Sequence, residues 1–469
     1  MTPKPEKLDT AIARDHLRAV VRLAHSPLAI VSLAILFAVI STLVFDASGD
    51  GSSAAAEPPR NHAERNGQGQ ATAATLTSIV RRGPELLRPP PDDQLGFDIS
   101  IEDADGRSMA GFHAALRRAE AGEGQARILF YGASHVASDL FTGYIRRELQ
   151  ARFGDAGHGV VLPAHPWRTY RHRGVEVESN RSFWDSRKVR AGDSDTDYYG
   201  VHGVYVESSR RGAFGRVSTA QQGDIGRNAS LFDLYYLNRP DGGSFDVLID
   251  GRPAQRVSSQ ADAIGPGYAT FRVPDGPHQL EVRLRGDGPV RFFGVAVERE
   301  TPGVMVDTLG INGARARYHL HWEDGLYREH LRRRNPDLVV LAYGTNESGD
   351  EYPIERYADE LRRVLTRVRQ VVPRASCLLV GPSDRPVRRA DGGWEDRPRT
   401  AAVVATQHRV AMEMGCGFFD LVSFSGGPLS MVEWSAADPA FGAPDHIHYT
   451  RRGYERLGEA LLGAMMRGY

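Results

Sequence analysis

The sequence predicts an α/β fold with a parallel sheet, interrupted by an inserted all-β domain and preceded by a transmembrane helix. Short apolar runs alternate with amphipathic segments around residue 130 and again beyond residue 303, as in sheets whose crossovers are helical. Between about residues 166 and 302 the helical periodicity disappears, and short strand-like runs separated by turn sequences replace it. Residues 27–45 contain no charge.

Composition sets the broad class. A chain of 469 residues with 41% hydrophobic residues is long enough for two or more globular domains with real cores. Its 58 lysines and arginines nearly balance its 59 aspartates and glutamates, so bulk charge gives no reason to expect a nucleic-acid partner.

The N-terminal region is expected to anchor the chain in a membrane. Residues 1–25 are polar and basic and are expected in the cytoplasm, because positive charge flanks the cytoplasmic end of a span. Residues 26–46 form the expected transmembrane anchor, and residues 47–95, rich in Gly, Ser, Ala and Pro, form a disordered linker. This predicts a single-pass inner-membrane protein with an extracytoplasmic, periplasmic catalytic domain. A signal peptide cleaved near Ala54–Ala56 is the alternative.

Residues 96–165 are expected to hold the first part of the α/β domain. Ser108–Glu120 predicts a short helix, and Ile128–Tyr131 predicts a buried strand. A tight turn at Gly132 and Ala133 follows, and apolar residues then recur at helical spacing as far as Phe153. Ser134 should therefore lie at a strand-to-helix corner, where a helix N-terminus favours developing negative charge.

Residues 166–302 are expected to form the inserted β-sandwich or jelly roll. Turn sequences such as Asp250-Gly251 and Asp275-Gly276 separate its short runs. The expected strands are Gly203–Glu207, Ser230–Leu237, Phe245–Ile249, Ala269–Val273, Gln279–Leu284 and Val290–Val297.

Residues 303–469 return to the α/β pattern. The expected strands are Val304–Thr308, Asp337–Ala342, Ser376–Val380 and Gly417–Leu421. The expected helices are Leu326–Arg333, Ile354–Val372, Arg399–Met414 and Arg451–Met466.

Residues suited to acyl transfer follow the expected strands. Ser134 follows the first strand, Gly313 the second and Asn346 the third, while Asp445 and His448 precede the last helix. Ligands bind beyond the carboxyl ends of parallel strands, so these residues are expected to converge. His448 could take the proton of the Ser134 hydroxyl, with Asp445 fixing the imidazole tautomer.

These segments resemble the four sequence blocks of SGNH (GDSL-type) hydrolases. The blocks are GASH at Gly132–His135, the glycine of GINGA at Gly313, GTN at Gly344–Asn346 and DHIH at Asp445–His448. The resemblance implies a flavodoxin-like α/β/α sandwich, a catalytic triad of Ser134, Asp445 and His448, and neither cofactor nor metal. It also implies an oxyanion hole made by the Ser134 and Gly313 N–H groups and the Asn346 side chain.

A narrower resemblance points to peptidoglycan O-acetylesterases, in which a carbohydrate-binding-module-like jelly roll splits the catalytic domain. It rests on the run Ser134–Tyr144, the β insertion and GGPLSM at Gly426–Met431. Ala133 departs from the family, which usually has aspartate there, and this puts the rigidity of the nucleophile turn in doubt.

Other residues receive structural interpretations. Asp139 is expected as a solvated carboxylate, and His135 and His446 as ordinary residues without a catalytic role. Trp434 is the tryptophan expected to face substrate. Cys377 and Cys416 are expected as buried thiols on neighbouring strands, with a disulfide as the alternative. The arginines 332–334 are expected to complement a helix dipole.

The sequence thus predicts a serine esterase that removes O-acyl groups, in the expected case O-acetyl groups, from a cell-envelope polysaccharide such as peptidoglycan. The expected partners are that acylated polysaccharide and the membrane, with no nucleic acid. Two alternatives stay open: an SGNH-type O-acyltransferase acting on a polysaccharide, and a catalytically weak polysaccharide-binding or scaffold protein.

Overall fold

The computed structural model describes residues 86–88, 95–190, 192, 198–223 and 225–469. The expected cytoplasmic N-terminus (1–25), transmembrane anchor (26–46) and nearly all of the linker (47–95) lie outside the described residues. Among the helices that are described, none is long and apolar enough to cross a bilayer. This finding corrects the predicted fold class and the single-pass inner-membrane location: the described residues form an α/β fold with a β-sandwich and contain no spanning helix.

A five-stranded parallel sheet forms the centre of the α/β part. Its strands are β3 (Gln125–Gly132), β15 (Gly303–Gly310), β16 (Leu338–Ala342), β17 (Ser376–Val380) and β20 (Gly417–Phe419). Their order is β15-β3-β16-β17-β20, a flavodoxin-like arrangement in which β3 lies between two strands that follow it in sequence. Gly132 is in register with Gly310 on one side and Ala342 on the other, so three strands end at the same level.

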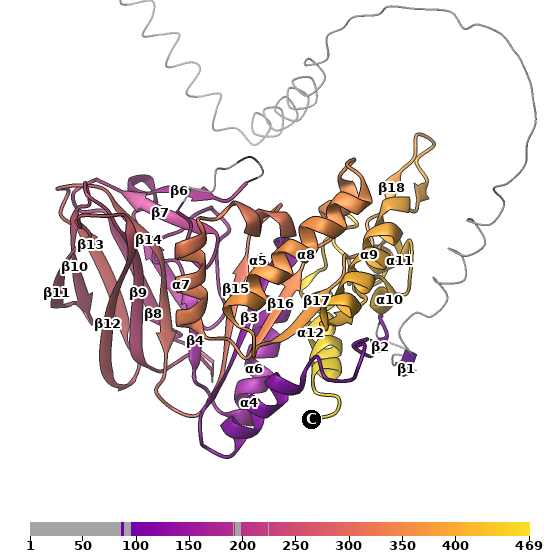
Figure 1. The fold of residues 1–469 in the computed structure, drawn as a ribbon, viewed down its shortest axis with the longest axis horizontal. Helices are drawn as coiled ribbons and strands as arrows, with labels where there is room; N and C mark the ends of the chain where they lie inside the picture. Colours follow the sequence, from indigo (N-terminus) through magenta and orange to yellow (C-terminus); the bar gives the residue numbers. More distant parts are fainter. Residues whose placement is uncertain (1–85, 89–94, 191, 193–197, 224) are drawn as a thin grey trace, which may run out of the picture. The chain divides into compact units, whose positions relative to one another are not determined.

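Helices cover both faces of this sheet (Figure 1). Side chains of β3 alternate between two cores because successive residues in a strand point to opposite faces. Leu129 and Tyr131 pack with α7, α8 and α9, whereas Ile128 and Phe130 pack with α4, α6 and α12. These helices are α4 (Ala110–Glu120), α6 (Phe141–Phe153), α7 (Asp324–Arg334), α8 (Ile354–Val371), α9 (Pro398–Met414) and α12 (Arg451–Met465).

Shorter elements complete this part. The short helices are α5 (Ser134–Ala137), α10 (Leu421–Ser425), α11 (Ser430–Ala436), η1 (Arg181–Phe183), η2 (Ala316–His321) and η3 (Glu347–Gly349). A two-stranded pair joins β18 (Val387–Arg388) to β19 (Trp394–Glu395). A second pair joins β1 (Leu86–Arg88), within the expected linker, to β2 (Asp98–Ile99).

The segment after β3 forms two helices rather than the single expected one. Asp139 lies between α5 and α6 with a φ of 48°, a left-handed conformation that breaks the helix. Its side chain is fully buried, which contradicts the expected solvated carboxylate. Burial would raise the pKa of Asp139, but the Arg146 guanidinium at 2.9 Å outweighs it and the pKa is lowered.

The inserted part is an antiparallel β-sandwich with its own core. One sheet has the order β11-β10-β13-β8-β5, and the other has the order β12-β9-β14-β7-β6, with β4 (Gly157–Val161) also paired to β14. The sandwich therefore includes a strand that precedes residue 166. The remaining strands are β5 (Val175–Ser179), β6 (Asp185–Lys188), β7 (Val204–Ser208), β8 (Phe214–Thr219), β9 (Ala229–Asn238), β10 (Ser244–Ile249), β11 (Arg252–Ser258), β12 (Gly265–Gly276), β13 (Gln279–Leu284) and β14 (Val290–Glu298).

Buried ion pairs join the sandwich to the α/β part beside α7 (Figure 1). Arg334 at the end of α7 bonds Asp307 of β15 at 2.9 Å and also pairs with Glu298 of β14. Arg333 bonds Asp233 of β9 at 2.7 Å. These two arginines therefore hold the two parts of the molecule together. The expected complementation of the helix dipole did not include this role.

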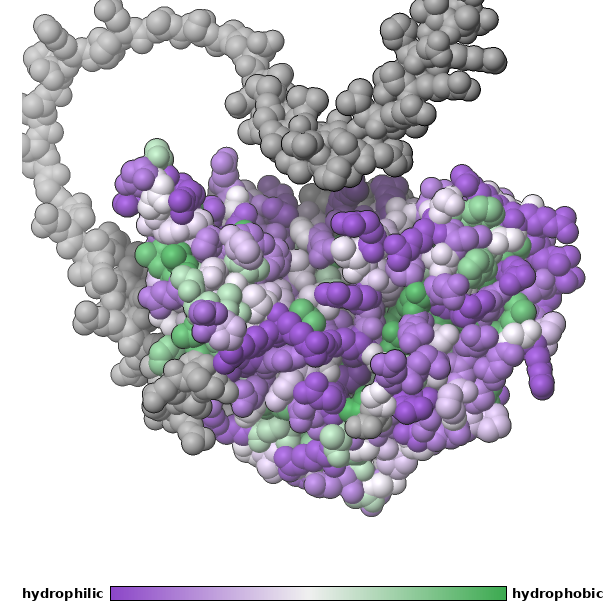
Figure 2. Space-filling view, turned by 180° about the vertical axis from the view of Figure 1, so that it is seen from behind, coloured by the Kyte–Doolittle hydropathy of each residue, from purple (hydrophilic) through white to green (hydrophobic). Residues whose placement is uncertain are grey.

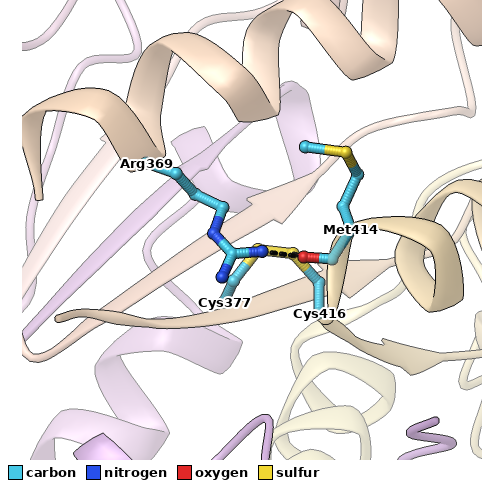
Figure 3. Close-up of a disulfide and its surroundings, with 4 residues drawn as sticks. All are labelled: Arg369, Cys377, Met414 and Cys416. Carbon is cyan, nitrogen blue, oxygen red and sulfur yellow. Dashed lines mark hydrogen bonds between the residues drawn. A yellow bond between two sulfur atoms is a disulfide. The ribbon is translucent and has the colours of Figure 1, made fainter. Parts of the chain in front are cut away.

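Cys377 and Cys416 form a disulfide between neighbouring segments of β17 and the turn before β20 (Figure 3). The expectation of two free thiols is therefore wrong, and the alternative, a disulfide, is the one observed. The Arg369 guanidinium lies beside the bridge and donates a hydrogen bond to the carbonyl of Met414 (Figure 3). The bridge links two adjacent strands at the amino-terminal edge of the sheet, away from the edge that carries Ser134.

The surface is predominantly polar. Figure 2 shows mostly hydrophilic residues on the face opposite to that of Figure 1, with apolar residues in small separate patches. Among the described residues, Ile264 is the one large apolar side chain that counts as exposed, at 47%. The described surface thus has no broad apolar docking face.

Candidate active site

Ser134 lies at the corner between β3 and α5, as the sequence predicts. Gly132 permits this corner, because a Cβ there would lie 2.3 Å from Val136 Cγ2 and 2.7 Å from the Ala342 carbonyl. Ala133 is almost fully buried. The turn is thus held by close packing of glycine against two neighbouring segments.

Two distant segments bring a hydroxyl, an imidazole and a carboxylate into one hydrogen-bonded line. Ser134 Oγ lies 2.7 Å from His448 Nε2, and His448 Nδ1 lies 2.7 Å from Asp445 Oδ2. Asp445 Oδ1 accepts the backbone N–H groups of Ile447 at 3.0 Å and His448 at 2.9 Å. The loop thereby fixes its own carboxylate against the imidazole.

The electrostatics of this line define its proton positions. Burial alone would raise the pKa of Asp445, but hydrogen bonds from His448 and Ile447 outweigh it and lower the pKa. An ionised carboxylate only accepts hydrogen bonds, so His448 Nδ1 carries the proton and Nε2 accepts from Ser134. An imidazole in this tautomer can act as a general base toward a serine hydroxyl.

Gly313 and Asn346 lie in the loops after the strands on either side of β3. Gly313 has a φ of 77°, and the space where a Cβ would stand is open. Asn346 Nδ2 donates one hydrogen bond to the Ala314 carbonyl at 2.9 Å, which links the two loops. An amide nitrogen carries two hydrogens, so the second can donate to a bound oxygen.

Glu347 is a site residue that the sequence analysis did not identify. Its side chain is 1% exposed, and its two oxygens accept from Ala316 N at 2.8 Å and from Gly344 N at 3.0 Å. One carboxylate thus ties the loop of Gly313 to the loop of Asn346. Burial raises the pKa of Glu347 even though these hydrogen bonds oppose it. The position of Glu347 directly after the GTN block does not predict that its carboxylate joins these two loops.

His135 supports the site from beneath. Its Nδ1 lies 2.8 Å from the Tyr454 hydroxyl and its Nε2 lies 3.1 Å from Ser383 Oγ. Its ring packs 5.3 Å from that of His448. Burial, followed by repulsion from His448, lowers the pKa of His135 to about 3, so the ring stays neutral and behaves as a fixed hydrogen-bonding support.

Two tryptophans lie in different environments near the site. Trp434 is buried and donates to the Ser425 carbonyl at 2.9 Å, so the expectation that it faces substrate is wrong. Trp394 instead packs its ring 4.2 Å from that of His446 in the Asp445–His448 loop. The sequence alone does not distinguish a buried tryptophan from a partly exposed one.

One set of metal-type side chains lies behind the nucleophile corner. Ligand atoms of Asp139, His158 and His172 lie within 4.8 Å of one another. The Asp139 oxygens, however, already accept five hydrogen bonds, two of them from the Arg146 guanidinium. A carboxylate neutralised by a cation and saturated with donors does not fit a metal ligand.

Comparisons with known proteins agree with this fold. Residues 274–456 match the family model described as the GDSL-like lipase/acylhydrolase family, a stretch that contains Gly313, Asn346, Asp445 and His448 and leaves out Ser134. Among solved structures, a peptidoglycan O-acetylesterase is 24% identical and has a TM-score of 0.63, over 78% of this chain and 97% of that chain.

Two further solved structures have low similarity. A family two carbohydrate esterase from Cellvibrio japonicus is 12% identical with a TM-score of 0.25, over 62% of this chain and 96% of that chain. A salicylyl-acyltransferase from a tetracycline biosynthetic pathway is 15% identical with a TM-score of 0.27, over the same shares of the two chains. No curated protein matches the sequence. The family match over residues 274–456 and the fold together support an SGNH (GDSL-type) hydrolase that resembles peptidoglycan O-acetylesterases.

Proposed function

We propose that the chain removes O-acetyl groups from a cell-envelope polysaccharide such as peptidoglycan, with Ser134 as nucleophile. The observation that carries the proposal is the hydrogen-bonded line of Ser134, His448 and Asp445, with both distances at 2.7 Å. The protein of similar structure is a peptidoglycan O-acetylesterase, which motivates the substrate class. A glycan ester also suits a site whose imidazole and carboxylate are open to solvent.

In the first half-reaction, Ser134 Oγ bonds to the ester carbonyl carbon while His448 Nε2 takes the hydroxyl proton. The carbonyl oxygen becomes an oxyanion that accepts hydrogen bonds from Ser134 N–H, Gly313 N–H and the Asn346 amide. His448 then returns the proton to the departing sugar oxygen as the ester C–O bond breaks. The products are a free sugar hydroxyl and an acetyl group on Ser134.

In the second half-reaction, water bonds to the acyl carbon while His448 takes one of its protons. The oxyanion forms against the same donors, and the bond from carbon to Ser134 Oγ then breaks. His448 returns its proton to Ser134, and acetic acid leaves. Asp445 stays ionised throughout and stabilises the imidazolium in each half-reaction.

The β-sandwich, in the proposed division at residues 96–165, 166–302 and 303–469, would present the glycan to this site. Lys188 Nζ of β6 donates to the Asn312 carbonyl at 2.9 Å, directly before Gly313. The sandwich therefore reaches the loop that carries one of the proposed oxyanion donors. This contact supports a role for the insertion near the substrate, beyond that of a remote appendage.

The test is acetate release by the full-length chain from O-acetylated peptidoglycan, measured beside an O-acetylated neutral glycan. The expected result is release that Ser134→Ala abolishes. The absence of serine-dependent release from either glycan and from 4-nitrophenyl acetate would refute the proposal. Transfer of acetyl to an added sugar hydroxyl, with no free acetate, would identify an O-acyltransferase instead.

A further inference from the structure

One loop at the carboxyl end of β17 forms a wall of the site. This wall loop, residues 381–397, contacts the residue after the nucleophile, because Ser383 Oγ lies 3.1 Å from His135 Nε2. The same oxygen lies 3.4 Å from the Ile447 carbonyl, and Trp394 packs against His446. The loop therefore borders both the nucleophile corner and the Asp445–His448 loop.

Arg385 in the wall loop lies beside a proposed oxyanion donor. Its Nη1 donates to the Thr345 carbonyl at 3.0 Å, and Thr345 directly precedes Asn346. The side chain is half-buried. Within the part of the chain that the structure describes, no carboxylate lies within ion-pair distance of this guanidinium.

Acidic groups around Arg385 bond to other partners. Asp350 bonds Arg315 at 2.6 Å and Arg317 at 3.2 Å, although it still attracts the Arg385 charge. Glu347 spends both of its oxygens on backbone N–H groups, and Asp384 Oδ2 accepts from Met431 N at 3.1 Å. Arg385 thus forms no ion pair with any of these three carboxylates.

Two other arginines repel the charge of Arg385. Arg397 donates through Nε to the Arg385 carbonyl at 3.2 Å, and Arg315 is close enough to repel the guanidinium. Burial, followed by repulsion from Arg397 and Arg315, lowers the pKa of Arg385. A partly desolvated cation without a counter-ion is costly, and such groups occur where a charged ligand binds.

Gly349 leaves room for this guanidinium. A Cβ at Gly349 would lie 2.4 Å from Arg385 Nη1, so any other residue would displace the cation. The backbone of Gly349 is outside the left-handed region, so conformation alone does not require glycine there. Glycine at position 349 instead leaves the space that the Arg385 guanidinium occupies.

We propose that Arg385 binds a carboxylate of the substrate next to the scissile ester, which makes the preferred substrate an acidic acetylated glycan. The inference rests on the proposed esterase function. It specifies in addition the charge of the substrate and the residue that recognises this charge. A planar guanidinium matches a carboxylate through two parallel hydrogen bonds, and Arg385 has N–H groups beyond the one bound to Thr345.

The test compares substrates that differ only in charge. The full-length chain is given an O-acetylated uronic-acid oligosaccharide, the same oligosaccharide with its carboxyls converted to amides, and neutral 4-nitrophenyl acetate. We expect kcat/KM for acetate release to be about 10- to 100-fold higher with the free carboxylates, as for hydrogen bonds to a charged group. An O-acetylated neutral glycan carrying a short acidic peptide distinguishes a peptide carboxylate from one on the sugar.

Variants assign the preference to one residue. Arg385→Gln should remove the preference through a higher KM on the acidic substrate, while turnover of 4-nitrophenyl acetate stays within about twofold. Arg385→Lys keeps the charge without the fork and should restore part of the preference. Arg389→Gln, an exposed arginine of the same loop that pairs with Asp391, is the matched control and should retain the full preference.

Equal rates on the acidic and amidated substrates in the unaltered chain would overturn the proposal without any variant. If Arg385→Gln lowered kcat/KM equally for the acidic substrate and for 4-nitrophenyl acetate, the proposal would also be overturned, since an equal loss indicates a structural role for Arg385. Serine-dependent turnover of 4-nitrophenyl acetate separates these outcomes from failure of the esterase function itself.

Discussion

Two charged networks in this molecule differ in their exposure. At the catalytic edge, the side chains of His448 and Asp445 are 37% and 49% exposed. At the junction between the sandwich and the parallel sheet, the side chains of Arg334 and Asp307 are each 1% exposed. Exposed pairs contribute little to stability but can exchange protons, whereas removing one member of a buried pair leaves an uncompensated charge.

The comparison separates two kinds of residue. Changes at the catalytic edge should alter rate while the protein stays folded, and changes at the junction should alter stability. The junction also positions β15, and the end of this strand leads to Gly313. A change should therefore affect both rate and stability only at a residue that supports a loop of the site.

The largest expected effect is on rate. Ser134→Ala should lower kcat by roughly 10⁴- to 10⁶-fold, as for loss of the nucleophile in a serine triad. Hydrolysis of 4-nitrophenyl acetate measures it, and thermal melting should show an unchanged midpoint. Ser258→Ala, at an exposed serine of the sandwich, is the control. Full activity in Ser134→Ala would refute the proposed nucleophile.

The buried histidines predict a pH dependence of stability. Burial lowers the pKa of His202, His319 and His330 to about 3 and that of His172 to about 4, all below the usual 6.5. Unfolded imidazoles bind protons that the folded ones refuse, so stability is full above pH 6.5 and falls as pH drops toward 4. Each histidine costs on the order of 1 kcal/mol per pH unit in this window. Urea unfolding at pH 7 and pH 5.5 measures the loss.

Equal unfolding free energies at these two pH values would contradict the assignment of the four rings as neutral and buried.

Arg334→Leu should destabilise the junction. The substitution leaves the buried Asp307 without its cation, while Glu298 keeps Arg127 at 3.0 Å, and the uncompensated carboxylate should cost about 3–5 kcal/mol. The free energy of unfolding in urea is the measurement. Arg332→Leu changes an exposed arginine of the same helix and should cost less than about 0.5 kcal/mol. Similar stabilities of the two variants would remove the contrast drawn between junction and edge.

The smallest expected effect is at Glu347, which joins two loops of the site. In Glu347→Gln, one oxygen becomes an NH₂ group that cannot accept from either Ala316 N or Gly344 N. One loop of the site should loosen and kcat should fall about tenfold with little change in KM, since poorly aimed donors lose transition-state stabilisation. Steady-state kinetics measure it, with the exposed Glu351→Gln as control. A rise in KM alone would contradict a positioning role.

Periodicity predicted the regular elements well. The expected helix 354–372 ends one residue beyond α8, and the expected strands 376–380 and 279–284 match β17 and β13. These elements have one buried face or are wholly buried, so their apolar residues recur at a clear period. The largely exposed β11 has no such pattern and was missed, since it joins the sandwich through its backbone.

The candidate site was only partly predictable. Ser134, Asp445 and His448 occur in short blocks with a recognisable order, and the structure brings these three side chains together. The buried positions of Asp139 and Trp434 depend on partners far away in the sequence, such as Thr308 for Asp139 and Gly96, which packs against the Trp434 ring. Local sequence does not encode such distant partners, so charge and aromatic character gave the wrong surface expectation.

The strand order also sets a schedule for biosynthesis. The strand that presents Ser134 is flanked by two neighbours that the ribosome makes much later, after the entire sandwich, and His448 is made later than all five strands of the sheet. A nascent chain that has released β3 can neither complete its sheet nor bring His448 to its serine. The proposed triad can therefore assemble only after the ribosome has passed residue 448.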